Sequence, residues 1–149
     1  MREYVAPAPI ADIKGMSLFQ WSESYSVGHQ EIDVQHKRLF QLAEELHSAM
    51  AAGKGKQVLS QTLASLISYT KGHFASEEGL MKRYNYPDYP AHKAEHEKLT
   101  SQVLAFQTDF NAGRAVMTID LMHFLKTWLA NHIGKIDQKV ASYIKAKAA

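Results

Sequence analysis

Histidines and carboxylates occur in this sequence in pairs at helical spacing. His73 and Glu77 are four residues apart, and so are His92 and His96. On an α-helix such a pair lies about 40° apart around the axis and one turn along it, so both side chains can reach one centre. Imidazole and carboxylate groups are common ligands of iron and zinc, so both pairs indicate metal binding.

A third pair, His132 and Asp137, is five residues apart, which is roughly 140° around a regular α-helix. This pair converges less obviously, and Asp137 would have to reach across toward a shared centre. The chain contains no cysteine, which excludes disulfides, iron–sulfur clusters, thiolate-ligated haem and cysteine zinc sites. A metal site must therefore be built from histidines and carboxylates.

The elements that would position these residues are four segments with helical periodicity. Apolar residues recur at helical spacing over about 33–52, 57–84, 89–111 and 119–145, and glycines or prolines separate the segments. The 149 residues, 46% of them hydrophobic, suit one domain with a sizeable core. The sequence predicts an all-α, up-down-up-down four-helix bundle over residues 18–149. Residues 1–17 are predicted to be an irregular leader, and Phe19, Trp21 and Tyr25 to form an N-terminal arm over the core.

Several polar side chains occupy core-facing positions of these helices, where leucine or phenylalanine is expected. In an up-down bundle, the beginnings of the first and third helices and the ends of the second and fourth lie together. The polar residues fall at matching depths near that end, whereas a buried carboxylate without a partner costs several kcal/mol. The predicted metal ligands are therefore His36, His73, Glu77, His92, His96, His132 and Asp137.

Four other residues are predicted to lie outside this cluster. His29, His47 and His123 are expected in loops or at the surface. Glu78 follows Glu77 but points about 100° away around the helix, so it is expected to be solvated.

Charge and hydropathy exclude other classes of partner. The formal net charge of +2 is too balanced to indicate binding to nucleic acid or to an anionic membrane. No apolar run approaches the roughly 20 residues that span a bilayer, and the first residues do not form a secretory signal. We therefore expect a soluble, cytoplasmic protein without membrane insertion.

The motifs of the sequence, taken in order, resemble those of the hemerythrin family, particularly its single-domain bacterial members. They are WSESYSVG at 21–28, DVQH ending at His36, HFASEE from His73, HKAEH from His92 and NHIGKID ending at Asp137. The resemblance implies that the seven residues above bind two non-haem iron ions. It also implies that Glu77, Asp137 and an oxo or hydroxo group bridge the two ions.

The function implied by the resemblance is reversible O2 binding for storage, delivery or buffering, with an oxygen-consuming client enzyme as one expected partner. Five imidazoles, two bridging carboxylates and one bridging hydroxide would leave one position open on two octahedral irons, which suits end-on binding of one small molecule. A fast enzyme needs an acid or base near that position; no spare residue is clearly placed for this role, so no enzymatic activity is expected. Leu39, Phe74, Leu129 and Ile133 are the predicted lining of the O2 pocket. The alternatives are a di-iron enzyme acting on peroxide or nitric oxide, an oxygen or redox sensor, and zinc in place of iron.

Overall fold

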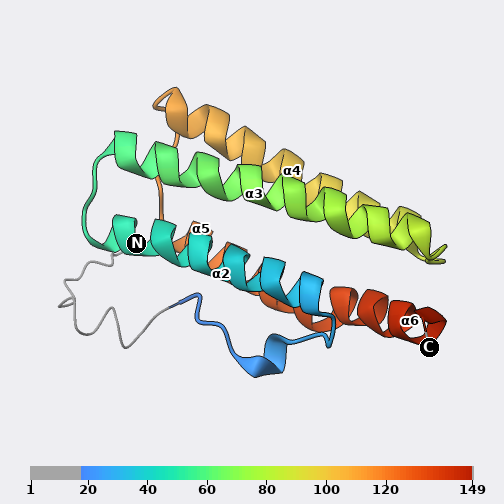
Figure 1. The fold of residues 1–149 in the computed structure, drawn as a ribbon. Coiled ribbons are helices and arrows are strands. Elements are labelled where there is room, and N and C mark those ends of the chain that lie inside the picture. Colours follow the sequence, from blue (N-terminus) through green and yellow to red (C-terminus); the bar gives the residue numbers. More distant parts are fainter. Residues whose placement is uncertain (1–17, 149) are drawn as a thin grey trace.

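The computed structural model describes residues 18–148, and its regular structure there consists of helices alone. Four helical stretches lie along one another as an up-down-up-down bundle (Figure 1), which confirms the predicted fold class. The predicted leader, residues 1–17, lies outside the described residues. The elements are η1 (Glu23–Tyr25), α2 (Gln30–Ala51), α3 (Lys56–Arg83), α4 (Tyr89–Asn111), α5 (Ile119–Asn131), η2 (His132–Asp137) and α6 (Gln138–Ala148).

The ends of the first three long helices follow signals in the sequence. Gly53 and Gly113 come just after α2 and α4 with φ of 72° and 80°, a left-handed conformation that glycine adopts without a steric penalty. Pro90 lies in the first turn of α4, where its missing N–H leaves no hydrogen bond unmade. The observed bounds therefore differ from the predicted ones by only a few residues.

The fourth long segment differs from the prediction of one continuous α-helix over 119–145. Between α5 and α6 the chain forms a π-helical turn, η2, over His132–Asp137. Because π-helical hydrogen bonds join residues five apart, the wider turn brings His132 and Asp137 to one face. Both side chains are buried in the bundle, so Asp137 does not have to reach across as a regular α-helix would require.

The described part of the N-terminal arm packs against α2, as predicted. The rings of Trp21 and Tyr25 lie 5.7 and 4.8 Å from the ring of Phe40, measured between centroids. The Asp33 carboxylate accepts hydrogen bonds from the Val27 backbone N–H, at 2.8 Å, and from the Ser26 hydroxyl. The arm is therefore held to α2 by both apolar and polar contacts.

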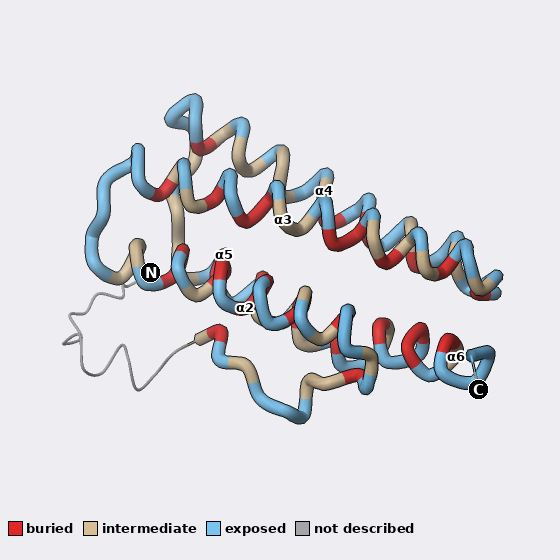
Figure 2. The backbone as a smooth tube through the Cα atoms, viewed as in Figure 1, coloured by how far each residue is buried: buried red, intermediate tan, exposed pale blue. Residues whose placement is uncertain are grey.

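A layer of buried polar side chains divides the apolar core of the bundle in two. Residues on the inner faces of all four long segments are buried along the bundle (Figure 2). The larger apolar cluster contains Leu46 and Leu63, and the smaller one is formed by Met81, Tyr86, Val140 and Ile144. In the sequence of α3 the buried polar residues lie between members of the two clusters, and so does Asp137 in the last segment, so apolar side chains flank the polar layer on both sides. Over residues 18–148, none of the helices has the length and apolar character needed to span a membrane.

Candidate metal centre

The structure brings all seven predicted ligand residues together in the polar layer. They come from four helical segments, because α2, α3, α4 and η2 each turn one face toward the bundle axis. Each is at most 3% exposed. The residues are His36 from α2, His73 and Glu77 from α3, His92 and His96 from α4, and His132 and Asp137 from η2.

The first group of candidate ligands contains three imidazoles. The Nε2 atom of His92 lies 3.1 Å from Glu77 Oε1 and 3.1 Å from Asp137 Oδ1. The Nε2 atom of His132 lies 3.0 Å from the same Asp137 oxygen and 3.1 Å from the Nε2 atoms of both His92 and His96. One candidate ligand atom from each of the five residues lies within 4.8 Å of the others, so they could surround one metal ion.

The second group contains two imidazoles and the other oxygens of the same carboxylates. His36 Nε2 lies 2.9 Å from Asp137 Oδ2 and 3.9 Å from Glu77 Oε2, and His73 Nε2 lies 3.7 Å from Glu77 Oε2. These four residues also fit around one ion. Glu77 and Asp137 therefore present one oxygen to each group, which is the arrangement needed to bridge two metal ions.

Several buried nitrogen and oxygen atoms of the cluster have no hydrogen-bond partner within residues 18–148, and two cations could coordinate them. His36 Nε2, Glu77 Oε2 and both carboxylate oxygens of Asp137 are buried and have no hydrogen-bond partner among the described residues. Leaving such atoms unpaired in a protein core costs free energy unless a cation or a proton compensates for them. Five imidazoles and two carboxylates form a donor set that suits iron and related divalent ions.

The electrostatics of the metal-free cluster indicate where a positive charge is favoured. Burial lowers the pKa of His73 to about 4. Burial also acts to lower the pKa of His92, but its contacts of 3.1 Å with the Asp137 and Glu77 carboxylates outweigh this effect and raise it to about 9. Burial acts to raise the pKa of Asp137, yet the close Nε2 atoms of His132, His36 and His92 hold it well below its ordinary value. Burial and the nearby Asp137 act to raise the pKa of Glu77, but its contacts with His92 and His96 lower it below its ordinary value. Both carboxylates therefore stay ionised, and the cluster attracts a positive charge.

Two residues that contact this cluster were not predicted to do so from the sequence. Glu78 was predicted to be solvated, but its carboxylate accepts a hydrogen bond from His96 Nδ1 at 2.8 Å and its side chain is only 19% exposed. Gln35 Oε1 lies 2.6 Å from His73 Nδ1. Glu78 lies on the side of α3 that faces α4, and helical periodicity within α3 alone does not reveal that neighbour. The only signals in the sequence were that each residue adjoins a predicted ligand.

The three histidines outside the cluster have different environments. His123 is exposed, as predicted. His29 is half-buried at the beginning of α2, where its Nδ1 accepts a hydrogen bond from the Ile32 backbone N–H. His47 is buried, which corrects the prediction of a surface position, because the arm residue Phe19 packs 6.4 Å from its ring.

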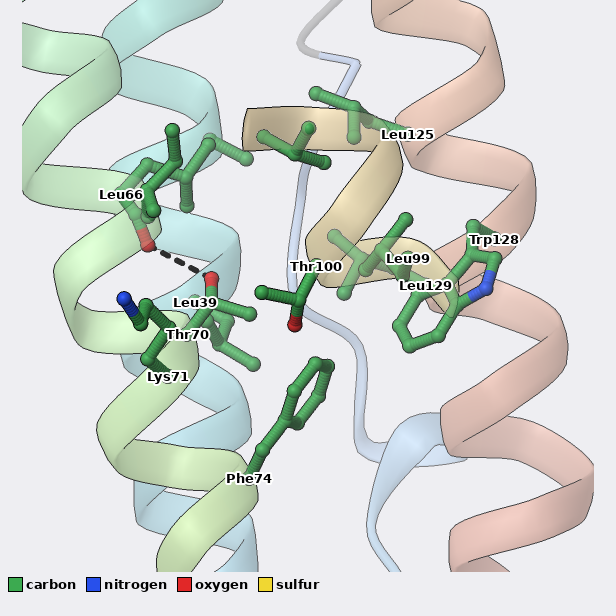
Figure 3. Close-up of a pocket in the computed structure, with 13 residues that line it drawn as sticks. Leu39, Leu66, Thr70, Lys71, Phe74, Leu99, Thr100, Leu125, Trp128 and Leu129 are labelled. Carbon is green, nitrogen blue, oxygen red and sulfur yellow. Dashed lines mark hydrogen bonds between the residues drawn. The ribbon is translucent and has the colours of Figure 1, made fainter. Parts of the chain in front are cut away.

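An apolar cavity of about 50 Å³ lies beside the polar layer (Figure 3). Leu39, Phe74 and Leu129, three of the four residues predicted to line an O2 pocket, line it together with Trp128. The fourth, Ile133, is buried in the larger apolar cluster and does not line this cavity.

Two aromatic rings connect this cavity with the histidine cluster. The Phe74 ring stacks on His96 with centroids 3.8 Å apart. The Trp128 ring stacks on His132 at 4.4 Å. Trp128 therefore packs over the core and also touches a candidate ligand.

Fold and site together define a class: helical bundles that hold metal ions by histidines and carboxylates from all four helical segments. The family model described as "Hemerythrin HHE cation binding domain" matches residues 27–144. A bacteriohemerythrin of Methylococcus capsulatus is 38% identical over 124 residues, which cover 83% of this chain and 94% of that protein. A bacteriohemerythrin of Stenotrophomonas maltophilia is 34% identical over 131 residues, with coverages of 88% and 84%.

Solved structures agree with this match. The crystal structure of a hemerythrin with a single leucine-to-alanine substitution aligns with a TM-score of 0.82 at 35% identity, covering 87% of this chain and 98% of that one. A wild-type hemerythrin structure aligns with a TM-score of 0.79 at 35% identity, with coverages of 84% and 96%. The chain belongs to the hemerythrin family. Members of this family generally bind O2 at a non-haem di-iron site.

The pKa shifts predict a stability maximum near pH 6.5 for the metal-free protein. His92 stabilises the fold while it is protonated, so its contribution is complete below pH 6.5 and is lost as the pH rises toward about 9. His73 stays neutral in the folded state down to about pH 4, so stability is also lost as the pH falls from 6.5. Urea unfolding of metal-free protein between pH 4 and 9 measures the free energy of unfolding on both sides of the maximum, which we call the acid limb and the alkaline limb of the pH profile.

Two variants assign the limbs of that pH profile. His92→Gln should flatten the alkaline limb, and His73→Gln should flatten the acid limb between pH 6.5 and about 4. A profile with no decline above pH 6.5 in the unsubstituted protein would contradict the assignment to His92.

Proposed function

We propose that this protein holds two iron ions between the two groups of ligands described above and binds O2 reversibly. The observation that supports this most directly is the orientation of Glu77 and Asp137. Each directs one carboxylate oxygen toward the three-histidine group and the other toward the two-histidine group. Carboxylates shared in this way suit a pair of ions rather than a single ion. The proposed ligands are His36, His73, Glu77, His92, His96, His132 and Asp137, within a domain of residues 18–149.

The two proposed iron positions receive unequal numbers of protein ligands. The position beside His92 would have three imidazoles, whereas the position beside His36 and His73 would have two. With both carboxylates and an oxo or hydroxo group shared, the position with fewer imidazoles has room for one small exogenous molecule. The iron pair would supply electrons to O2 on binding and recover them on release.

The surroundings of the cluster favour reversible binding because they exclude water. The cavity, at about 50 Å³, has room for a small molecule, because a single water needs only roughly 10–15 Å³. Its lining is apolar, however, and cavities lined by apolar side chains stay dry. Leu39 lies three residues after His36, and Thr70 three residues before His73, so the cavity begins one turn from both imidazoles of the two-histidine group. We propose this cavity as the O2 pocket, with Leu39, Phe74 and Leu129 in its wall.

The same cavity favours an oxygen carrier over an enzyme. Reactions of peroxide or nitric oxide at high turnover need a proton donor or acceptor near the bound substrate. Among the residues that line the cavity, Lys71 alone is ionisable, and it is exposed to solvent. We therefore propose O2 storage, delivery or buffering as the role, with O2 as the ligand and an oxygen-consuming enzyme as a client.

The ligand assignment predicts the iron content of two alanine variants. His92→Ala removes an imidazole from the centre of the cluster and should lower the iron content from two per chain to one or fewer. His123→Ala changes an exposed histidine on α5 and should keep two. Elemental analysis of folded protein reconstituted with Fe(II) measures both. Equal iron content in the two variants would refute the assignment.

The proposed function predicts a reversible spectral change. Protein loaded anaerobically with Fe(II) should gain a visible charge-transfer band when O2 is admitted and lose it when the solution is purged with argon. Full recovery of the O2-free spectrum over several cycles would support a carrier. Irreversible oxidation within the first cycle, with consumption of added peroxide or nitric oxide, would support the enzyme instead.

The cavity predicts that Leu129 protects the centre from oxidation. Leu129 is 9% exposed, so Leu129→Ala removes apolar cover between the cavity and solvent; both irons should stay bound, but the O2-bound form should autoxidise several-fold faster because water reaches the centre more easily. Leu63→Ala makes the same change at a buried leucine that does not line the cavity, and should leave the autoxidation rate within about twofold. Decay of the visible spectrum in air measures both rates, and equal acceleration in the two variants would exclude a specific role of the cavity.

A further inference from the structure

The two groups of proposed ligands differ in the residues that contact the outer nitrogen of their imidazoles. In the three-histidine group, the Nδ1 atom of His96 contacts the Glu78 carboxylate at 2.8 Å. In the two-histidine group, the Nδ1 atom of His73 contacts the neutral amide oxygen of Gln35 at 2.6 Å. The two imidazoles are thus held in similar ways, but by groups of different charge.

The remaining imidazoles have no such partner within the described residues. His36 Nδ1 and His92 Nδ1 are buried without a hydrogen bond. His132 Nδ1 lies 3.6 Å from the Glu95 carboxylate, which is too far for a hydrogen bond, and the Glu95 side chain is 49% exposed. Glu78 is therefore the one carboxylate of the described chain that is hydrogen-bonded to the outer nitrogen of a proposed ligand.

The orientation of the His96 ring is determined by two contacts. Its Nε2 atom points into the cluster, 3.1 Å from Glu77 Oε1, and must be free of a proton in order to bind a metal ion. The single ring proton is then on Nδ1, where it is donated to Glu78. The ring also stacks on Phe74, with an angle of 3° between the planes, so it cannot rotate without breaking both contacts.

We propose that Glu78 is a positioning residue that makes the three-histidine position the tighter and more electron-rich of the two metal positions. By accepting the Nδ1 proton, Glu78 fixes the His96 tautomer and increases the basicity of its Nε2 atom. The side chain of Glu78 is mostly buried, so solvent screens its negative charge less than that of Glu95. Gln35 orients His73 without adding a charge. This inference rests on the proposed role of His96 as an iron ligand.

The two metal positions therefore differ in how firmly they hold an ion and in which oxidation state they favour. The ion at the three-histidine position is retained firmly and is stabilised in its oxidised state by the additional negative charge nearby. The ion at the two-histidine position has a neutral outer partner and the open coordination position. Glu78 therefore acts on the retention and the reduction potential of one ion, although it is not itself a ligand.

The test compares Glu78→Gln with Glu95→Gln, because both remove one carboxylate from a side chain near an imidazole Nδ1 atom. Each protein is loaded anaerobically with two Fe(II), and release of the ions to excess ferrozine is followed over time. Glu78→Gln keeps a hydrogen-bond acceptor for His96 and removes the negative charge, and mutation of such an outer partner typically weakens metal binding by about 10–100-fold. We expect Glu78→Gln to accelerate release of one of the two ions by about 10–100-fold and of the other by less than about twofold. Glu95→Gln should leave both release rates within about twofold of the original.

A second measurement separates an electronic role from a purely structural one. The midpoint potential of the iron pair should become more positive in Glu78→Gln, because the oxidised state loses a nearby negative charge, and should change less in Glu95→Gln. Melting temperatures of the metal-free variants report the effect on the fold itself. If Glu78→Gln accelerates both releases equally, in step with a lower metal-free melting temperature, Glu78 acts only through the fold and the inference fails.

The outcomes also distinguish this inference from the proposed function. If the unsubstituted protein does not hold two Fe(II), the proposed di-iron centre fails and the role of Glu78 fails with it. If the unsubstituted protein holds two Fe(II), but Glu78→Gln matches it in release rates and potential, the di-iron centre stands and the inference alone is refuted.

Discussion

The structure depends on one electrostatic constraint: two carboxylates, Glu77 and Asp137, are ionised inside a helical core. An unpaired charge in such a place costs several kcal/mol, so the surrounding structure has to supply positive charge or hydrogen-bond donors. Five imidazoles supply it in part, and His92 has a pKa raised to about 9 because it lies between both carboxylates. Some buried nitrogen and oxygen atoms of the cluster still have no hydrogen-bond partner in the part of the chain that the structure describes, and a pair of cations would coordinate them. Binding of the proposed metal ions would therefore be linked to folding.

Several features of the bundle follow from that constraint. Apolar clusters close the polar layer on both sides, which keeps the charges away from water and strengthens their interactions. The π-helical turn η2 directs His132 and Asp137 to one face of a segment that is otherwise regular helix. Such turns interrupt the regular pattern of hydrogen bonds and occur frequently at functional sites. Here the turn provides both a carboxylate and an imidazole to the centre of the bundle.

The centre is asymmetric in three respects that support one another. One group has three imidazoles and the other two. The charged outer partner, Glu78, belongs to the first group, and the neutral one, Gln35, to the second. An apolar cavity approaches the cluster from one side, with Phe74 between its interior and the His96 ring. In the proposed centre, one firmly held ion, a neighbouring ion with an open position and a dry cavity would together suit reversible binding of a small apolar gas.

Helical periodicity was sufficient to predict the four-helix bundle and the convergence of the polar residues of its first three long segments, because both depend on which residues of a helix share a face. The convergence of Asp137 with His132 depends on the π-helical turn. That information is local, and bundle topology then brings the faces together. The π-helical turn, the burial of His47 and the contact between Glu78 and His96 could not be predicted in the same way. They depend on how one segment packs against another: the arm covers His47, and α4 places His96 beside a residue that would be solvated on an isolated α3. Sequence alone determined which side chains lie at the centre, and only the tertiary structure decided which neighbours surround them, since those contacts join residues that are distant along the chain.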